Sequence, residues 1–188
     1  MKALADPKIF HGALDCCFSG GRPRNVWRID RLKENLYVLI LSEEKTDFSS
    51  FCKKFSPSES SWETKDYEPL LSRLKKGDTW RFKLSANPTC RVGEKGKITA
   101  HAAPKCQKEW LMKKSLKNGF QLESDGFDVI ENKWFKFRKD STNAVTILSV
   151  TYEGLLMITD VELFRKALVN GIGRGKAYGM GLLTVVRA

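Results

Sequence analysis

One histidine near the start of the chain has neighbours suited to acid–base chemistry. His11 follows Lys8 by three residues and precedes Asp15 by four, a spacing that stacks all three on one side of a helix. Imidazole is the side chain that most readily exchanges a proton near neutral pH, so His11 is a candidate general acid or base. A surface histidine without any catalytic role fits the same pattern, and the spacing alone leaves both interpretations open.

A glycine-rich segment near the other end, residues 171–181, offers backbone amides together with Arg174 and Lys176. It is not a Walker loop, because Asn170 stands where that motif needs glycine and Ala177 where it needs a hydroxyl. A dinucleotide loop follows a strand and opens a helix, whereas this segment is predicted to follow a helix and precede a strand. The segment could approach a phosphodiester closely. The alternative is a helix C-cap followed by packing glycines.

A second basic segment covers residues 133–139. Its alternation places Trp134, Lys136 and Arg138 on one face of a strand, and the polar residues 140–143 then favour a turn. Such a hairpin suits phosphate contacts along a duplex, although an ordinary edge strand guarded by lysines has the same residues. The motif typical of RNA-recognition sheets is absent from the sequence.

The charge of the whole chain agrees with a polyanionic partner. Its 188 residues include 33 Lys and Arg against 22 Asp and Glu, a formal net charge of +11. The excess is spread over both halves of the chain, so the positive field is expected on folded surface rather than on a basic tail.

Several classes of protein are disfavoured by what the sequence lacks. It has no apolar run of the roughly 18 to 20 residues that a membrane span needs and no signal peptide, so we expect a cytoplasmic protein without membrane contact. Five cysteines without a CxxC pair favour free, mostly buried thiols. Two histidines and no HExxH motif disfavour a metal site, so we expect chemistry without metal or cofactor.

The elements that must position these groups alternate between helix and strand. A helix is expected over residues 6–17, capped by Asp6, and a loop with one short helix over 42–66. A basic linker is expected over 91–103, a helix from Pro104 to Gly119, and a helix capped by Asp160 and ended by Gly171. Strands are expected over residues 26–29, 36–41, 79–84, 127–139, 145–158 and 181–186. This order predicts an α+β protein with tandem ferredoxin-like (RRM-like) domains, over residues 1–88 and 89–188.

Several motifs together resemble the CasE family, the CRISPR repeat-RNA endoribonucleases of the type I-E Cascade complex. They are residues 4–7 followed by His11, Trp27-Arg28, residues 82–88 ending in Ala-Asn-Pro, residues 109–111, and the glycine-rich residues 171–183. The resemblance implies a metal-independent endoribonuclease that cuts repeat-RNA hairpins through attack by a 2′-hydroxyl. The products would be a 2′,3′-cyclic phosphate and a mature crRNA that stays bound, with other Cascade subunits as partners.

The resemblance also implies roles for individual residues. His11 would be the catalytic acid or base and Lys8 a second catalytic residue, while the RNA-binding set would be Lys136, Arg138, Lys139, Gly173, Arg174, Gly175 and Lys176. Lys8 stands where the family commonly has tyrosine, and a cation there could stabilise a developing phosphate charge. Family members also have a strand before residue 4, so we expect the first strand to be missing or truncated. Two alternatives remain: a crRNA-hairpin-binding subunit with weak or no cleavage, and an unrelated basic RNA-binding protein.

Overall fold

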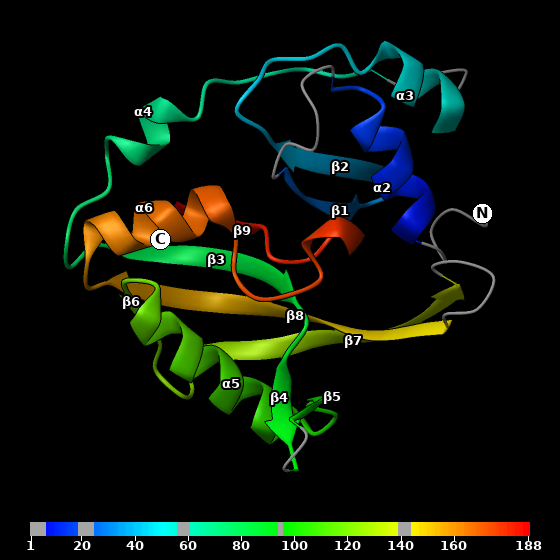
Figure 1. Ribbon diagram of the computed structural model, residues 1–188. Coiled ribbons are helices and arrows are strands. Elements are labelled where there is room, and N and C mark those ends of the chain that lie inside the picture. The colour runs from blue at the N-terminus through cyan, green and yellow to red at the C-terminus, as the bar shows by residue number, and fades with distance from the viewer. Residues whose placement is uncertain (1–6, 19–24, 56–60, 94–95, 139–143) are drawn as a thin grey trace.

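The protein is a mixed α+β structure (Figure 1). The computed structural model describes residues 7–18, 25–55, 61–93, 96–138 and 144–188. The elements up to residue 71 are α2 (Pro7–Asp15), β1 (Val26–Leu32), β2 (Asn35–Leu41), α3 (Ser49–Phe55) and α4 (Glu68–Leu71). Those that follow are β3 (Thr79–Ala86), β4 (Thr89–Val92), β5 (Lys97–Ala100), α5 (Pro104–Lys117), β6 (Phe120–Gln121), β7 (Phe127–Arg138), β8 (Ala144–Ile158), α6 (Val161–Asn170), the 3-10 helix η1 (Lys176–Tyr178) and β9 (Leu183–Arg187).

The larger sheet has the strand order of a ferredoxin-like unit. β3 lies between β8 and β9 and is antiparallel to both, while β7 pairs with the outer edge of β8. The chain therefore runs β3, α5, β7, β8, α6, β9, with both helices on one face of the sheet (Figure 1). Alternation in β3 buries Trp80, Phe82 and Leu84 and leaves Arg81 exposed, so the helix-covered face holds the main core.

Helix ends follow the signals in the sequence. The Asp160 side chain accepts a hydrogen bond of 2.9 Å from the Leu163 backbone N–H, and α6 ends at Gly171 with φ of 68°. α5 begins at Pro104, and Gly119 follows it with φ of 75°. A Cβ at Gly119 would lie 2.3 Å from the Asp160 carbonyl oxygen, so only glycine fits this turn.

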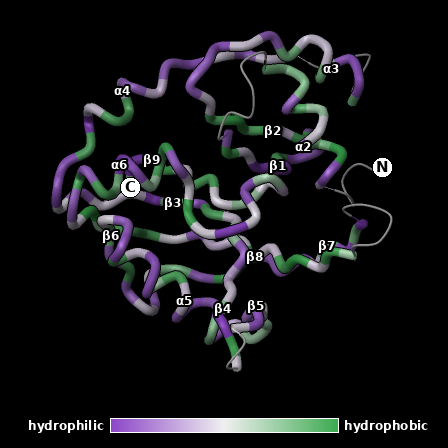
Figure 2. The backbone as a smooth tube through the Cα atoms, in the orientation of Figure 1, coloured by the Kyte–Doolittle hydropathy of each residue, from purple (hydrophilic) through white to green (hydrophobic). Residues whose placement is uncertain are grey.

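The N-terminal elements form a second, smaller core. β1 and β2 pair as an antiparallel hairpin, and β2 is mostly hydrophobic (Figure 2). α2 and α3 pack on the hairpin through Phe10, Leu14, Trp27 and Phe51. The strand expected to be missing or truncated concerns residues 1–6, which lie outside the described residues.

The division between residues 88 and 89 stays a prediction; β3, on its N-terminal side, hydrogen-bonds to β8 and β9. The linker expected over residues 91–103 is wrong, because β4 and β5 form a short hairpin there. Its strands are mostly exposed and pair locally, so they lack the apolar alternation that predicts a strand.

All five cysteines are free as predicted, but none is buried, since Cys16 is exposed and the others are intermediate. Among the helices in the described ranges, none is long and apolar enough to cross a membrane.

Candidate functional site

Helix α2 holds His11 on its outer side. Phe10 and Leu14 are buried against the smaller core, which turns His11 and Asp15 outward. The His11 Nδ1 atom lies 3.4 Å from the Asp15 Oδ1 atom, and the two side chains are 37% and 39% exposed. The predicted stacking of these residues is confirmed, and His11 is accessible to a ligand.

The glycine-rich segment is a tightly packed loop around η1. Gly175 and Gly179 flank η1 with φ of 84° and 78°, a left-handed conformation that favours glycine. A Cβ at Gly179 would lie 2.8 Å from the Trp27 ring, and one at Gly173 would lie 3.2 Å from the Trp110 ring.

The structure therefore supports a packing role for these glycines and a capping role for Gly171. It also leaves Arg174 exposed and Lys176 half-buried at the surface of the loop. Contact of Gly173 and Gly175 with RNA stays a prediction.

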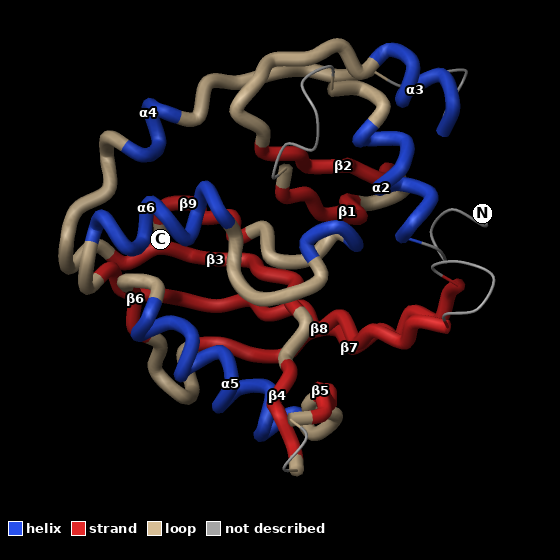
Figure 3. The backbone as a smooth tube through the Cα atoms, in the orientation of Figure 1, coloured by secondary structure: helices blue, strands red, loops and turns tan. Residues whose placement is uncertain are grey.

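The basic hairpin is a long arm formed by β7 and β8, and it extends well beyond the rest of the sheet (Figure 3). Trp134, Lys136 and Arg138 are exposed on one face as predicted, whereas Phe137 on the other face is buried. Lys139 lies outside the described residues. The arm presents two cations of the predicted set to solvent.

Three segments far apart in the sequence meet beside His11. The Tyr178 ring of η1 lies 4.8 Å from the Phe137 ring of β7 and 6.4 Å from the His11 ring, between ring centroids. The Lys8 Nζ atom donates a hydrogen bond of 3.3 Å to the Arg138 carbonyl oxygen. Helix α2, the far end of the arm and the glycine-rich loop thus form one surface, which we call the histidine surface.

The histidine surface can attract and contact a phosphate group. Lys8 and Arg138 lie on it, and Lys176 belongs to the same loop turn as Tyr178. Among the residues that the structure describes, the carboxylate beside His11 is that of Asp15, and these three cations outnumber it. An anionic ligand is therefore favoured at the point where an imidazole can exchange a proton.

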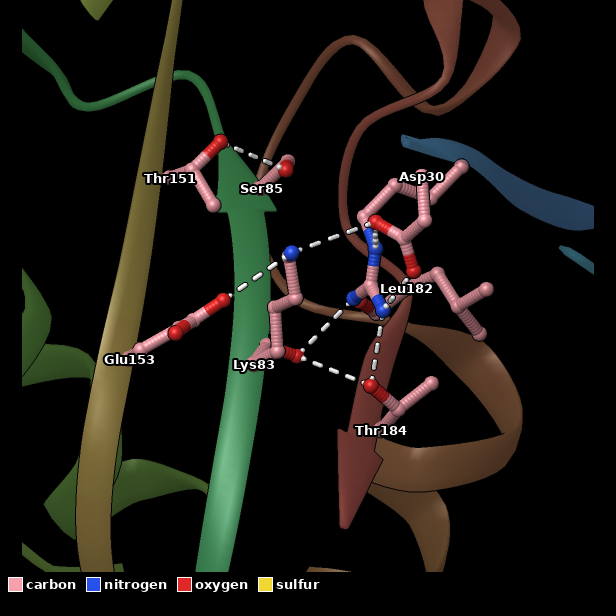
Figure 4. Close-up of polar contacts among 8 residues, drawn as sticks. Asp30, Lys83, Ser85, Thr151, Glu153, Leu182 and Thr184 are labelled. Atoms are coloured by element: carbon pink, nitrogen blue, oxygen red, sulfur yellow. Dashed lines mark hydrogen bonds and ion pairs between the residues drawn. The ribbon is translucent and has the colours of Figure 1, made fainter. Parts of the chain in front are cut away.

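A buried arginine joins the N-terminal hairpin to the larger sheet. Figure 4 shows its partners Asp30, Leu182 and Thr184 gathered beside Lys83. Arg28 is only 2% exposed, and its guanidinium donates to both carboxylate oxygens of Asp30 at 2.9 Å. It also donates to the Lys83 and Leu182 carbonyl oxygens at 2.9 Å and to the Thr184 hydroxyl at 2.8 Å. Because Trp27 next to it packs on Gly179, this link also fixes the position of the glycine-rich loop.

Asp30 stays ionised within this network. Burial opposes its charge, but the hydrogen bonds and charges of Arg28 and Lys83 outweigh burial and lower the pKa of Asp30. The open cleft beside it is lined by Asp30, Arg31, Lys83 and Glu131 among others. The formal charges of these four cancel, so the cleft is a weaker site for phosphate than the histidine surface.

Sequence reasoning missed three residues of this arrangement. Tyr178 lies in the glycine-rich segment and Phe137 in the basic segment, and neither residue was assigned a role from the sequence. Arg28 was named only as part of the Trp27-Arg28 motif that resembles CasE. Their importance depends on contacts between distant segments, which no local pattern contains. A signal was available for Arg28, because an arginine between apolar residues of a predicted strand must have partners if it is buried.

The fold and this surface define a class: an α+β protein with ferredoxin-like topology that presents a histidine among cations. A family model described as CRISPR associated protein matches residues 1–187. The chain belongs to this family, and its resemblance to CasE is confirmed.

Individual relatives cover almost the whole chain. The CRISPR-associated endoribonuclease Cse3 of Thermus thermophilus is 30% identical over 201 residues, which cover 97% of this chain and 90% of the relative. The solved structure of Thermus thermophilus Cse3 bound to an RNA representing a pre-cleavage complex matches with a TM-score of 0.84 and 29% identity, covering 98% and 91% of the two chains. A chain of a CRISPR RNA-guided surveillance complex, pre-nicking, matches with a TM-score of 0.69 and 26% identity over 97% and 90%. The predicted tandem ferredoxin-like fold is confirmed by these matches.

Proposed function

We propose that this protein is an endoribonuclease that cuts CRISPR repeat-RNA hairpins into mature crRNA without a metal and keeps hold of the product. The proposal is supported by the activity named for its 30% identical relative and by the RNA in the matching Cse3 structure. Within this chain, the observation that best supports the proposal is that His11, Tyr178 and Arg138 lie together on the histidine surface. We further propose that it acts in the cytoplasm with other Cascade subunits, in line with its match to a surveillance complex.

The proposed reaction uses the RNA as its own nucleophile. His11 accepts the proton of a 2′-hydroxyl while that oxygen attacks the adjacent phosphorus. The bond from O2′ to phosphorus forms as the bond from phosphorus to O5′ breaks. Water gives a proton to the leaving O5′, and His11 then returns its own proton to the solvent. The products are a 2′,3′-cyclic phosphate and a 5′-hydroxyl. The Lys8 ammonium would stabilise the charge that develops on the phosphate oxygens.

The arm and the glycine-rich loop would grip the hairpin. A-form RNA has a deep, narrow major groove, so contacts to phosphates and to shape are the expected mode of recognition. Lys136, Arg138 and Lys139 would contact stem phosphates, and Gly173, Arg174, Gly175 and Lys176 would contact the strand near the cut. The proposed N-terminal domain, residues 1–88, would thus supply the acid–base group, and residues 89–188 most of the RNA contacts.

The purified protein should cut a hairpin repeat RNA in the presence of EDTA. The expected upstream product ends in a 2′,3′-cyclic phosphate, which resists phosphatase until acid opens the ring, and the downstream product begins with a 5′-hydroxyl. Cleavage that stops in EDTA and returns with a divalent cation would contradict the metal-independent mechanism.

Replacement of Lys8 tests the alternative that the chain is an RNA-binding subunit with weak cleavage. This alternative is favoured by the lysine at position 8, because the CasE family commonly has a tyrosine there. If Lys8 stabilises the reacting phosphate, we expect Lys8→Ala to slow single-turnover cleavage by about 10-fold, and Lys8→Tyr to keep or raise the rate. The exposed Lys53 of α3 provides a control, since Lys53→Ala should leave the rate unchanged. If Lys8→Ala and Lys8→Tyr both cut at the wild-type rate, this position takes no part in catalysis.

Loss of single cations should change the salt dependence of RNA binding. Each phosphate contact releases counterions, so Arg138→Ala and Lys176→Ala should each weaken binding and reduce the slope of log K against log salt by about 1. Lys76→Ala is the control, because Lys76 lies far from the arm. It precedes β3, at the end of the sheet where Thr79 of β3 pairs with Met157 of β8. Along β8 that end is about 40 Å from the pairing of Arg138 with Ala144. A wild-type slope in both site variants would show that Arg138 and Lys176 are ordinary surface residues that do not contact phosphate.

A further inference from the structure

Tyr178 occupies a position on the histidine surface that its backbone holds firmly. It is the last residue of η1, between two glycines whose left-handed conformations fix the turn. Trp27 packs directly under Gly179, the next residue, and leaves no space for a Cβ there. Because Arg28 locks the same strand to the larger sheet, the loop that carries Tyr178 has little freedom to move.

The Tyr178 ring bridges the RNA-binding arm and the acid–base helix. On one side it contacts Phe137, which is buried at 7% exposure, with ring centroids 4.8 Å apart. On the other side the His11 ring meets it edge-on, with an interplanar angle of 70° and centroids 6.4 Å apart. A displacement of the arm by RNA would therefore be transmitted through this ring to His11.

The hydroxyl of Tyr178 has no part in this packing. The side chain is half-buried, and within the part of the chain that the structure describes its hydroxyl has no hydrogen-bond partner. A phenylalanine would make the same ring contacts. A phenol hydroxyl is both donor and acceptor, and a buried one normally finds a partner. Here the group remains available beside His11 and near the cations that attract phosphate.

The geometry points to Tyr178 as a further catalytic residue: its hydroxyl donates a hydrogen bond to the phosphate that is cut, and its ring holds the His11 imidazole against the far end of the arm. This inference rests on the proposed function, because it assigns the hydroxyl to the phosphate of the RNA substrate. A fixed donor aimed at a phosphate oxygen stabilises the charge that grows there as O2′ attacks.

The first test separates the hydroxyl from the ring by single-turnover cleavage of a hairpin repeat RNA. Tyr178→Phe removes only the hydroxyl and should lower the maximal rate by about 10-fold or more. Tyr178→Leu also removes the ring and should lower it further. The control is Tyr37→Phe, since Tyr37 on β2 is 47% exposed and outside the histidine surface. A wild-type rate for Tyr178→Phe would overturn the inference.

A second test needs no cleavage and distinguishes failure of this inference from failure of the proposed function. The affinity of the protein is measured for hairpin RNA that ends at the cut in a 3′-phosphate and for the same RNA that ends in a 3′-hydroxyl. The wild-type protein should prefer the phosphate form, and Tyr178→Phe should lose at least about threefold of that preference. An equal preference in both proteins would overturn the role of Tyr178. A wild-type protein that shows the preference but cuts no RNA would refute the proposed function and leave the contact standing.

Discussion

His11→Ala should lower the single-turnover rate of hairpin cleavage by about 10²-fold or more, the usual effect of losing a general acid or base. RNA affinity should stay close to that of the wild type, because the arm and the loop provide the phosphate contacts. The half-exposed His11 also lies outside the core, so the variant should fold normally.

The other histidine of the chain provides the matched control. His101 follows β5 and takes no part in the histidine surface, so His101→Ala should cut at the wild-type rate. A His11→Ala protein as active as the wild type would remove His11 from the reaction and favour the alternative in which the chain only binds RNA.

Arg28→Met should cause the largest loss of stability among the changes considered. It removes the Arg28 donor from Asp30, from the Lys83 and Leu182 carbonyls and from the Thr184 hydroxyl. Within the described residues, Asp30 then keeps only Lys83 as its cationic partner. Removing one partner of such a pair costs about 3 kcal/mol of unfolding free energy, and more where the site cannot relax. For a chain of this size that corresponds to a fall in Tm of about 10 °C.

Arg187→Met is the control for this change. Arg187 lies on β9, three residues from Thr184, but is exposed, so its loss should change the unfolding free energy by no more than about 0.5 kcal/mol. Chemical unfolding followed by tryptophan fluorescence measures both variants. Equal stability of Arg28→Met and the wild type would show that the network does not hold the hairpin to the sheet.

Most elements of the fold were predictable because their signals are local. The cap at Asp160, the glycine at 171 and the proline at 104 each mark a helix end within a few residues. The alternation of residues 133–138 likewise predicts which side chains face solvent. The hairpin of β4 and β5 was missed because exposed polar strands carry no such alternation.

The site was predictable residue by residue but not as an assembly. His11, Arg138 and Lys176 each have a local pattern, yet nothing in those patterns places helix α2 against the end of β7. The hydrogen bond from Lys8 to the Arg138 carbonyl forms only because the fold brings the end of β7 next to helix α2. For the same reason the position of Tyr178, between Phe137 and His11, follows only from the packing of Trp27 under the loop.

The most direct test of the central claim replaces one hydroxyl in the RNA. A hairpin repeat RNA is prepared with a single 2′-deoxy nucleotide immediately upstream of the cut and incubated with the wild-type protein in EDTA. The proposed mechanism predicts that the deoxy RNA binds with the affinity of the all-ribose RNA but is not cut, because it lacks the nucleophile. Cleavage of the deoxy RNA at the same position would contradict attack by the 2′-hydroxyl.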